Sequence, residues 1–172
     1  MRFQPFRFPP TLFANQDTRG KAVRNRIWIL AADGNAARIV KDVNLLKDGR
    51  QHPEEETYQI EGKRAQDIMA DKPGRSHSSV GHGRSAMEYS SDPVREEQHR
   101  FAVEIAEKID HYALENAFEN LVICAAPRTL GDLRKLLSHQ VKERTVAEID
   151  RNCVAVPTDQ LIATVKSVVF PS

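Results

Sequence analysis

The segment 72–91 carries the residues best suited to binding a charged ligand. It reads Lys-Pro-Gly-Arg-Ser-His-Ser-Ser-Val-Gly-His-Gly-Arg-Ser-Ala-Met-Glu-Tyr-Ser-Ser. Glycine lets a backbone approach a polyanion closely, and an exposed arginine can bond a phosphate through two N–H groups. The composition predicts a loop that enters an RNA groove or an active centre; a solvated flexible linker is the alternative. The candidate RNA-binding residues are Lys72, Arg75, His77, Gly81, His82, Gly83, Arg84 and Ser85.

Other ligand chemistries fit this segment less well. It contains no Gly-x-Gly-x-x-Gly and no Gly-Lys-Thr, which disfavours a nucleotide cradle. His77 and His82 could ligate a metal, but no cysteine or carboxylate cluster accompanies them, as a zinc site would require. We therefore predict neither a metal nor a cofactor here. His99 and His111 are expected on the polar flank of a helix.

An enzymatic alternative rests on carboxylates outside this segment. A metal-dependent nuclease needs several carboxylates that converge on divalent ions. Asp33 ends one predicted strand, Glu148 lies in another, and Asp150 follows it. Against this, Asp33 belongs to an Asp-Gly-Asn turn signal, where aspartate is favoured because it bonds the backbone. A serine hydrolase is not expected, since the Gly-x-Ser-x-Gly elbow is absent.

Composition narrows the class of protein. The chain has 172 residues, 25 Lys and Arg, 24 Asp and Glu, and a net charge of +1, which excludes a histone-like binder of bulk polyanion. No run approaches the roughly 18 apolar residues of a membrane helix. Cys124 and Cys153 are too few for a disulfide scaffold and stand in apolar surroundings. We therefore expect buried thiols and a cytoplasmic location.

The near-neutral total hides a basic N-terminal segment. Residues 1–26 hold six Lys and Arg against one Asp, together with four Phe and three Pro. Prolines and arginines interrupt the apolar stretch that a secretory signal needs. We expect residues 1–25 to be a basic, flexible arm, with contact to phosphates as its alternative role. Residues 26–172 are then one domain with a long polar loop at 61–91.

The elements that position these residues follow from apolar spacing. The run 27–32, the turn signal Asp33-Gly34-Asn35 and the run 36–41 predict a β-hairpin. Asp92-Pro93 is a typical helix start. Residues 43–46 either extend the hairpin to a third strand or lead out of the sheet. Further strands are predicted over 58–60, 120–126 and 145–149, and helices over 92–117, 129–141 and 158–169.

The order of these elements predicts an α/β fold. Antiparallel strands come first, and the later alternation of helix and strand implies parallel pairing through right-handed crossovers. We therefore expect a mixed β-sheet flanked by helices. That arrangement is the layout of ribonuclease-H-like α/β domains, with a flavodoxin-like sheet as the alternative.

Three sequence blocks resemble the bacterial host-attachment family, whose members are described as required for attachment to host cells. They are Trp-Ile-Leu-Ala-Ala-Asp-Gly-Asn-Ala-Ala-Arg-Ile at 28–39, Arg-Ser-Ala-Met-Glu at 84–88 with the helix start at 92–102, and Ala-Ala-Pro-Arg-Thr-Leu-Gly-Asp-Leu-Arg at 125–134. The blocks occur in the family's order, and the resemblance covers about residues 26–170.

That family is similar to the central domain of archaeal and eukaryotic peptide-chain release factors. In those proteins a Gly-Gly-Gln loop followed by Ser-Ala reaches the ribosomal peptidyl transferase centre. Here the matching place reads Gly-His-Gly-Arg-Ser-Ala at 81–86, so Arg84 stands where the catalytic glutamine would be. The resemblance implies a ribosome- or tRNA-contacting module without the hydrolytic step. Peptidyl-tRNA hydrolysis and a literal role at the cell surface are the alternatives, and the sequence does not indicate an oligomeric state.

Overall fold

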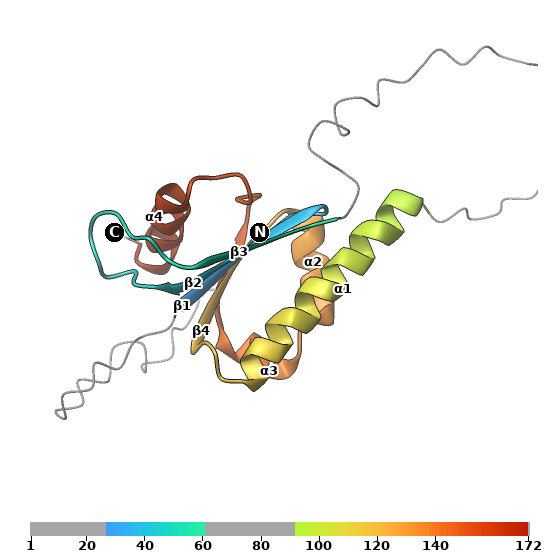
Figure 1. Ribbon diagram of the computed structural model, residues 1–172, viewed down its shortest axis with the longest axis horizontal. Helices are drawn as coiled ribbons and strands as arrows, with labels where there is room; N and C mark the ends of the chain where they lie inside the picture. Colours follow the sequence, from blue (N-terminus) through green and yellow to red (C-terminus); the bar gives the residue numbers. More distant parts are fainter. Residues whose placement is uncertain (1–26, 61–91, 172) are drawn as a thin grey trace, which may run out of the picture.

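A computed structural model of the protein describes residues 27–60 and 92–171 (Figure 1). It is an α/β domain built on a mixed five-stranded open sheet in the order β3-β2-β1-β4-β5. The strands are β1 (Ile27–Ala32), β2 (Ala36–Val43), β3 (Glu55–Gln59), β4 (Asn120–Ala125) and β5 (Thr145–Asp150). The helices are α1 (Pro93–Leu114), α2 (Pro127–Leu136), α3 (His139–Arg144) and α4 (Thr158–Val169).

The apolar strand β1 is the centre of the sheet. All six of its residues are buried, because it pairs with β2 on one side and β4 on the other and is covered on both faces. The pairing with β2 is antiparallel, and those of β1 with β4 and of β4 with β5 are parallel. The predicted hairpin and the predicted mixed sheet are therefore confirmed.

Alternate residues of the strands face two apolar cores. The core of Trp28, Leu30 and Ile39 packs against α1, α2 and α3. The core of Ile29 and Val40 packs against α4 on the opposite face (Figure 1). Because both faces of the central strands are covered, residues at odd and at even positions are apolar, and these strands appear in the sequence as continuous hydrophobic runs.

One predicted helix is two helices in the structure. The sequence predicted a continuous helix over 129–141, but α2 ends at Leu136, and Leu137 is extended with ψ of 139°. Ser138 then caps α3: its hydroxyl accepts from the Val141 N–H, and its own N–H donates to Asp110 Oδ1 at 3.1 Å. A capping serine competes with helix continuation through this bonding, which explains the break. The third strand also differs from its prediction over 58–60, since β3 spans Glu55–Gln59.

The two cysteines lie in the core beneath α4, at 0% exposure for Cys124 and 1% for Cys153. Both thiols are free. Burial is the main cause that raises the pKa of the Cys124 thiol to about 12, and the neighbouring Cys153 adds to this effect.

We expect neither thiol to react with a disulfide reagent such as Ellman's reagent at pH 8, because the thiolate is the reactive form. Both should react within minutes in guanidinium. Titration of free thiols before and after unfolding measures this, and rapid labelling of the native protein would contradict the observed burial.

Candidate functional site

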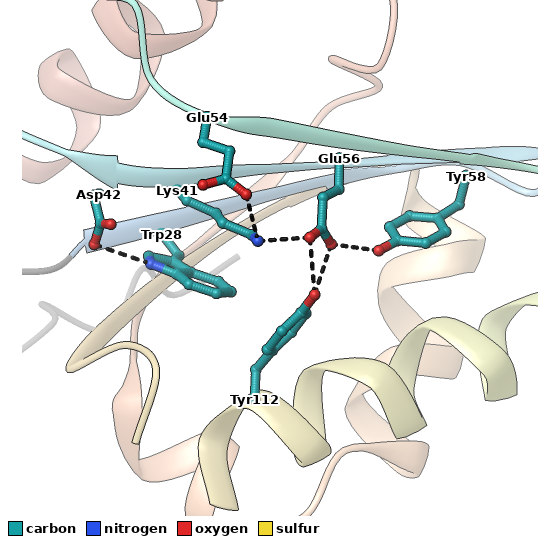
Figure 2. Close-up of polar contacts among 7 residues, drawn as sticks. All are labelled: Trp28, Lys41, Asp42, Glu54, Glu56, Tyr58 and Tyr112. Atoms are coloured by element: carbon teal, nitrogen blue, oxygen red, sulfur yellow. Dashed lines mark hydrogen bonds and ion pairs between the residues drawn. The ribbon is translucent and has the colours of Figure 1, made fainter. Parts of the chain in front are cut away.

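A network of charged and aromatic side chains joins the sheet to α1 (Figure 2). The Glu56 carboxylate is its centre. Lys41 Nζ lies 2.6 Å from Glu56 Oε1, and the Tyr112 hydroxyl donates to both carboxylate oxygens at 2.8 and 2.9 Å. The Tyr58 hydroxyl donates to Glu56 Oε2. We call this set the Glu56 cluster: Trp28, Lys41, Asp42, Glu54, Glu56, Tyr58 and Tyr112.

An irregularity in the sheet places two polar side chains opposite one aromatic ring. Ile27 pairs with Val43 and Ile29 with Val40, so Trp28 lies opposite both Lys41 and Asp42. Asp42 has φ of 52°, a left-handed conformation that aspartate tolerates better than most residues. As a result Lys41 Nζ lies 5.3 Å from the centroid of the Trp28 ring, while Trp28 Nε1 donates to Asp42 Oδ1 at 3.4 Å. Such bulges commonly redirect side chains in this way.

The ionisation states of Glu56 and of the three groups bonded to it are fixed by their contacts. Burial opposes ionisation of Glu56, but hydrogen bonds from Lys41, Tyr58 and Tyr112 outweigh it and hold the pKa of Glu56 at about 2. Burial also opposes the charge of Lys41, yet its bonds to Glu56 and Glu54 raise the Lys41 pKa. Burial and the Glu56 carboxylate raise the pKa of Tyr58 and of Tyr112.

These fixed states decide what the cluster can do. General acid–base catalysis needs a group whose pKa lies near the working pH. Glu56 stays ionised at neutral pH, Lys41 stays protonated, and the two tyrosines keep their protons. The cluster therefore acts as an anchor that ties the edge strand β3 to α1.

The predicted RNA-binding residues lie outside the described residues. This applies to Lys72, Arg75, His77, Gly81, His82, Gly83, Arg84 and Ser85. What the structure does place is the chain on either side of them, because β3 precedes segment 61–91 and α1 follows it.

Both flanks of segment 61–91 are held beside the turn that joins β1 to β2. The Ile60 N–H donates to the Asn35 carbonyl oxygen at 3.0 Å. On the other flank, a β-carbon on Gly34 would lie 2.8 Å from Gln98 Cδ in the second turn of α1, so glycine permits this close approach. The Asp92 side chain caps α1 by accepting from the Val94 N–H at 3.1 Å. Ile60 and the second turn of α1 thus lie beside one turn at the carboxyl ends of the parallel strands, and α1 begins beyond that edge of the sheet (Figure 1), where open α/β sheets bind ligands.

The three carboxylates of the nuclease alternative are engaged separately. Asp33 Oδ1 accepts from the Asn35 and Ala36 N–H groups at 2.8 and 2.9 Å, and Asp33 Oδ2 accepts from Asn152. Glu148 Oε2 lies 2.6 Å from the Arg134 guanidinium, and Asp150 is exposed at the end of β5. Over residues 27–60 and 92–171, no three His, Cys, Asp or Glu side chains form a group that could hold a metal ion. The structure therefore does not bring Asp33, Glu148 and Asp150 together as a metal-binding group.

A protein-family model described as "protein required for attachment to host cells" matches residues 28–165. The chain belongs to this family. The match runs from Trp28 in β1 to Val165 in α4, so it reaches every described strand and helix and omits only the first residue of β1 and the last turn of α4. No curated protein matches the chain. Among the described helices of this host-attachment family member, none is long and apolar enough to cross a membrane.

Sequence reasoning missed the Glu56 cluster in this family member. Lys41 continues the inward-facing positions Ala37 and Ile39 of β2, and Glu56 and Tyr58 alternate on the inner face of β3. A charge at an inward position of a strand needs a partner. That signal could have pointed to Lys41 and Glu56, but Tyr112 lies 56 residues from Glu56 and carries no local sign of the contact.

Proposed function

We propose that this host-attachment family protein is a non-catalytic, release-factor-like module that contacts ribosomal or transfer RNA through residues 72–91. The observation that carries the proposal is the placement of both flanks of segment 61–91 beside the Asp33–Ala36 turn. A segment held at both ends on a rigid scaffold can present its side chains to a partner at one defined edge of the domain.

Charge supports the choice of this segment over the scaffold. Residues 27–60 and 92–171 contain 14 Lys and Arg against 19 Asp and Glu, a net charge of −5, so the folded body repels a polyanion. Residues 72–91 contain Lys72, Arg75 and Arg84 against Glu88, a net charge of +2. Phosphate contacts from lysine and arginine dominate affinity for nucleic acids.

The non-catalytic part of the proposal rests on position 84. The place of the release-factor glutamine is taken by Arg84, which cannot give up a proton and serves as a phosphate ligand.

The sheet order β3-β2-β1-β4-β5, in which β2 alone runs opposite to the other described strands, supports the ribonuclease-H-like and release-factor-like assignment of the fold. A ribosome-contacting role implies a cytoplasmic location, which cell fractionation tests.

Ribosome co-sedimentation at physiological salt tests the proposal. The Arg75→Ala/Arg84→Ala double variant is expected to bind at least about tenfold more weakly and to lower the slope of log affinity against log salt by about 2. A matched control is Lys135→Ala/Lys142→Ala, which removes two exposed positive charges from the end of α2 and from α3, at the opposite end of the parallel strands, and should bind like the wild type.

Two results would overturn the proposal. One is an Arg75→Ala/Arg84→Ala variant that pellets with ribosomes as well as the wild type. The other is equal weakening by both double variants, which would indicate a general charge effect rather than contacts made by the 72–91 segment.

A further inference from the structure

The outer side of β3 offers backbone groups for another strand. The Ile60 N–H donates to the Asn35 carbonyl oxygen, and the Lys41 N–H donates to the Glu54 carbonyl oxygen. These bonds show that the backbone N–H and C=O groups of the even-numbered residues along β3 point toward β2. Antiparallel pairs alternate, so the N–H and C=O groups of Glu55, Thr57 and Gln59 point away from the sheet. None of the described strands pairs with them, because β3 is an edge of the sheet. Such an edge is a template for strand addition.

A groove lies at the carboxyl end of this edge. It has a volume of about 380 Å³ and lies between the end of β3 and α1. Ile60 and Phe101 give it apolar walls, while Gln59, Glu97, Arg100 and Glu104 make the rest polar. An edge strand next to a helix is an arrangement that binds extended peptides, since the strand supplies backbone bonds and the groove receives alternate side chains.

We propose that residues 11–21 of this chain add to the outer edge of β3 as an antiparallel strand. Charge complementarity and chain connectivity support this occupant. Residues 11–21 carry a net charge of +1 within an N-terminal segment, residues 1–26, of net charge +5, and the described body carries −5. The basic segment is also covalently attached, so its effective concentration at the edge is high. The proposal is independent of the RNA-binding proposal and replaces the expectation of a wholly flexible arm.

The position of Ile27 fixes the direction of the added strand. β1 and β3 run parallel, so residue 26 leaves the sheet at the end where β3 begins. A strand outside β3 would lie three inter-strand spacings from β1, about 14 Å, which about five extended residues span. The added segment must then run toward Ile27 and hence opposite to β3. Pro9 and Pro10 lack the N–H groups that a ladder needs, which sets the upstream limit at Thr11.

Hydrogen exchange of the full chain, resolved by residue, tests this proposal. At low salt the outward amides of Glu55, Thr57 and Gln59 should exchange at least about tenfold more slowly than unstructured amides. The Arg19→Glu/Lys21→Glu variant should lose this protection, since it reverses two charges inside the proposed strand. Its matched control, Arg2→Glu/Arg7→Glu, makes the same change of charge upstream of Pro9 and should keep the protection.

The inward amides of Glu56 and Tyr58 report whether each variant is folded, because their bonds go to β2. Three results would overturn the proposal. The outward amides could exchange at the unprotected rate in the wild type. Both variants could lose protection equally, which would indicate a general charge effect. Protection could rise with protein concentration, which would identify a second copy as the occupant.

Discussion

Replacing Glu56 with glutamine is expected to lower the free energy of unfolding at pH 7 by about 2–3 kcal/mol. Glutamine has nearly the same shape, but it cannot carry the charge that Lys41 Nζ meets at 2.6 Å. It also presents an amide N–H₂ where one of the tyrosine hydroxyls now donates. Lys41 has a side chain only 12% exposed, so the loss of its main partner leaves a largely buried cation.

The chain supplies a matched control for this variant. Glu54 bonds the same Lys41 Nζ at 2.9 Å, but its side chain is 72% exposed. Exposed ion pairs contribute about 0–1 kcal/mol, so Glu54→Gln should change the unfolding free energy by about 0.5 kcal/mol or less. Urea denaturation followed by circular dichroism measures both variants. Equal losses of unfolding free energy in the two variants would show that the greater burial of Glu56 does not strengthen its contact with Lys41.

Acid should reveal the same interaction. The folded pKa of Glu56, about 2, lies below its ordinary value of 4.5, so its contribution is complete above about pH 4.5 and is lost as the pH falls toward 2. Glu56→Gln lacks this contribution at every pH. The difference in unfolding free energy between wild type and variant should therefore shrink between pH 5 and pH 2.5. A constant difference across that range would contradict the assignment.

Replacing Trp28 with alanine is expected to cost about 3–5 kcal/mol of stability, as large truncations in cores do. Trp28 is 3% exposed, and its ring lies edge-on to Tyr112 and tilted against Phe118, with centroids 5.0 and 5.3 Å away. The truncation would remove those contacts together with the Lys41 cation–π contact and the hydrogen bond to Asp42.

Trp28→Phe is the conservative comparison for this truncation. It keeps an aromatic ring against Tyr112 and Phe118 but loses the indole N–H and some volume, so we expect a cost of about 1–2 kcal/mol. Since Trp28 is the one tryptophan of the chain, far-ultraviolet circular dichroism rather than fluorescence must follow unfolding. A cost below about 1 kcal/mol for Trp28→Ala would show that the aromatic contacts are not structural.

Local signals in the sequence predicted most of the fold. The apolar run of β1 and the Asp33-Gly34-Asn35 turn identified the hairpin, and Asp92-Pro93 identified the start of α1 because capping is a local interaction. The sequence analysis did not predict the break at Ser138, because Leu133, Leu136 and Leu137 keep helical spacing up to it. That break depends on Asp110, 28 residues away, whose carboxylate accepts from the Ser138 N–H.

The candidate site was less predictable than the fold. Glycine and arginine identified segment 72–91 from composition, and its residues lie outside the described ranges. The Glu56 cluster instead depends on long-range pairing: Lys41 meets Glu56 only because β2 pairs with β3, and Tyr112 reaches it only because α1 crosses that face of the sheet. The alternation of side chains along a strand predicts which face of the sheet a residue lies on, but it does not predict which helix covers that face.

The central place of β1 in the sheet has a consequence for synthesis of the protein. Among the described strands β1 is made first, yet its parallel partner is β4, and Ile27 pairs with Asn120. A chain that emerges from a ribosome can close the β1–β2 hairpin early, but the other edge of β1 lacks its β4 partner until about 80 more residues have followed Val43. Fragments that end before β4 therefore keep a hydrophobic strand edge exposed and are prone to aggregate.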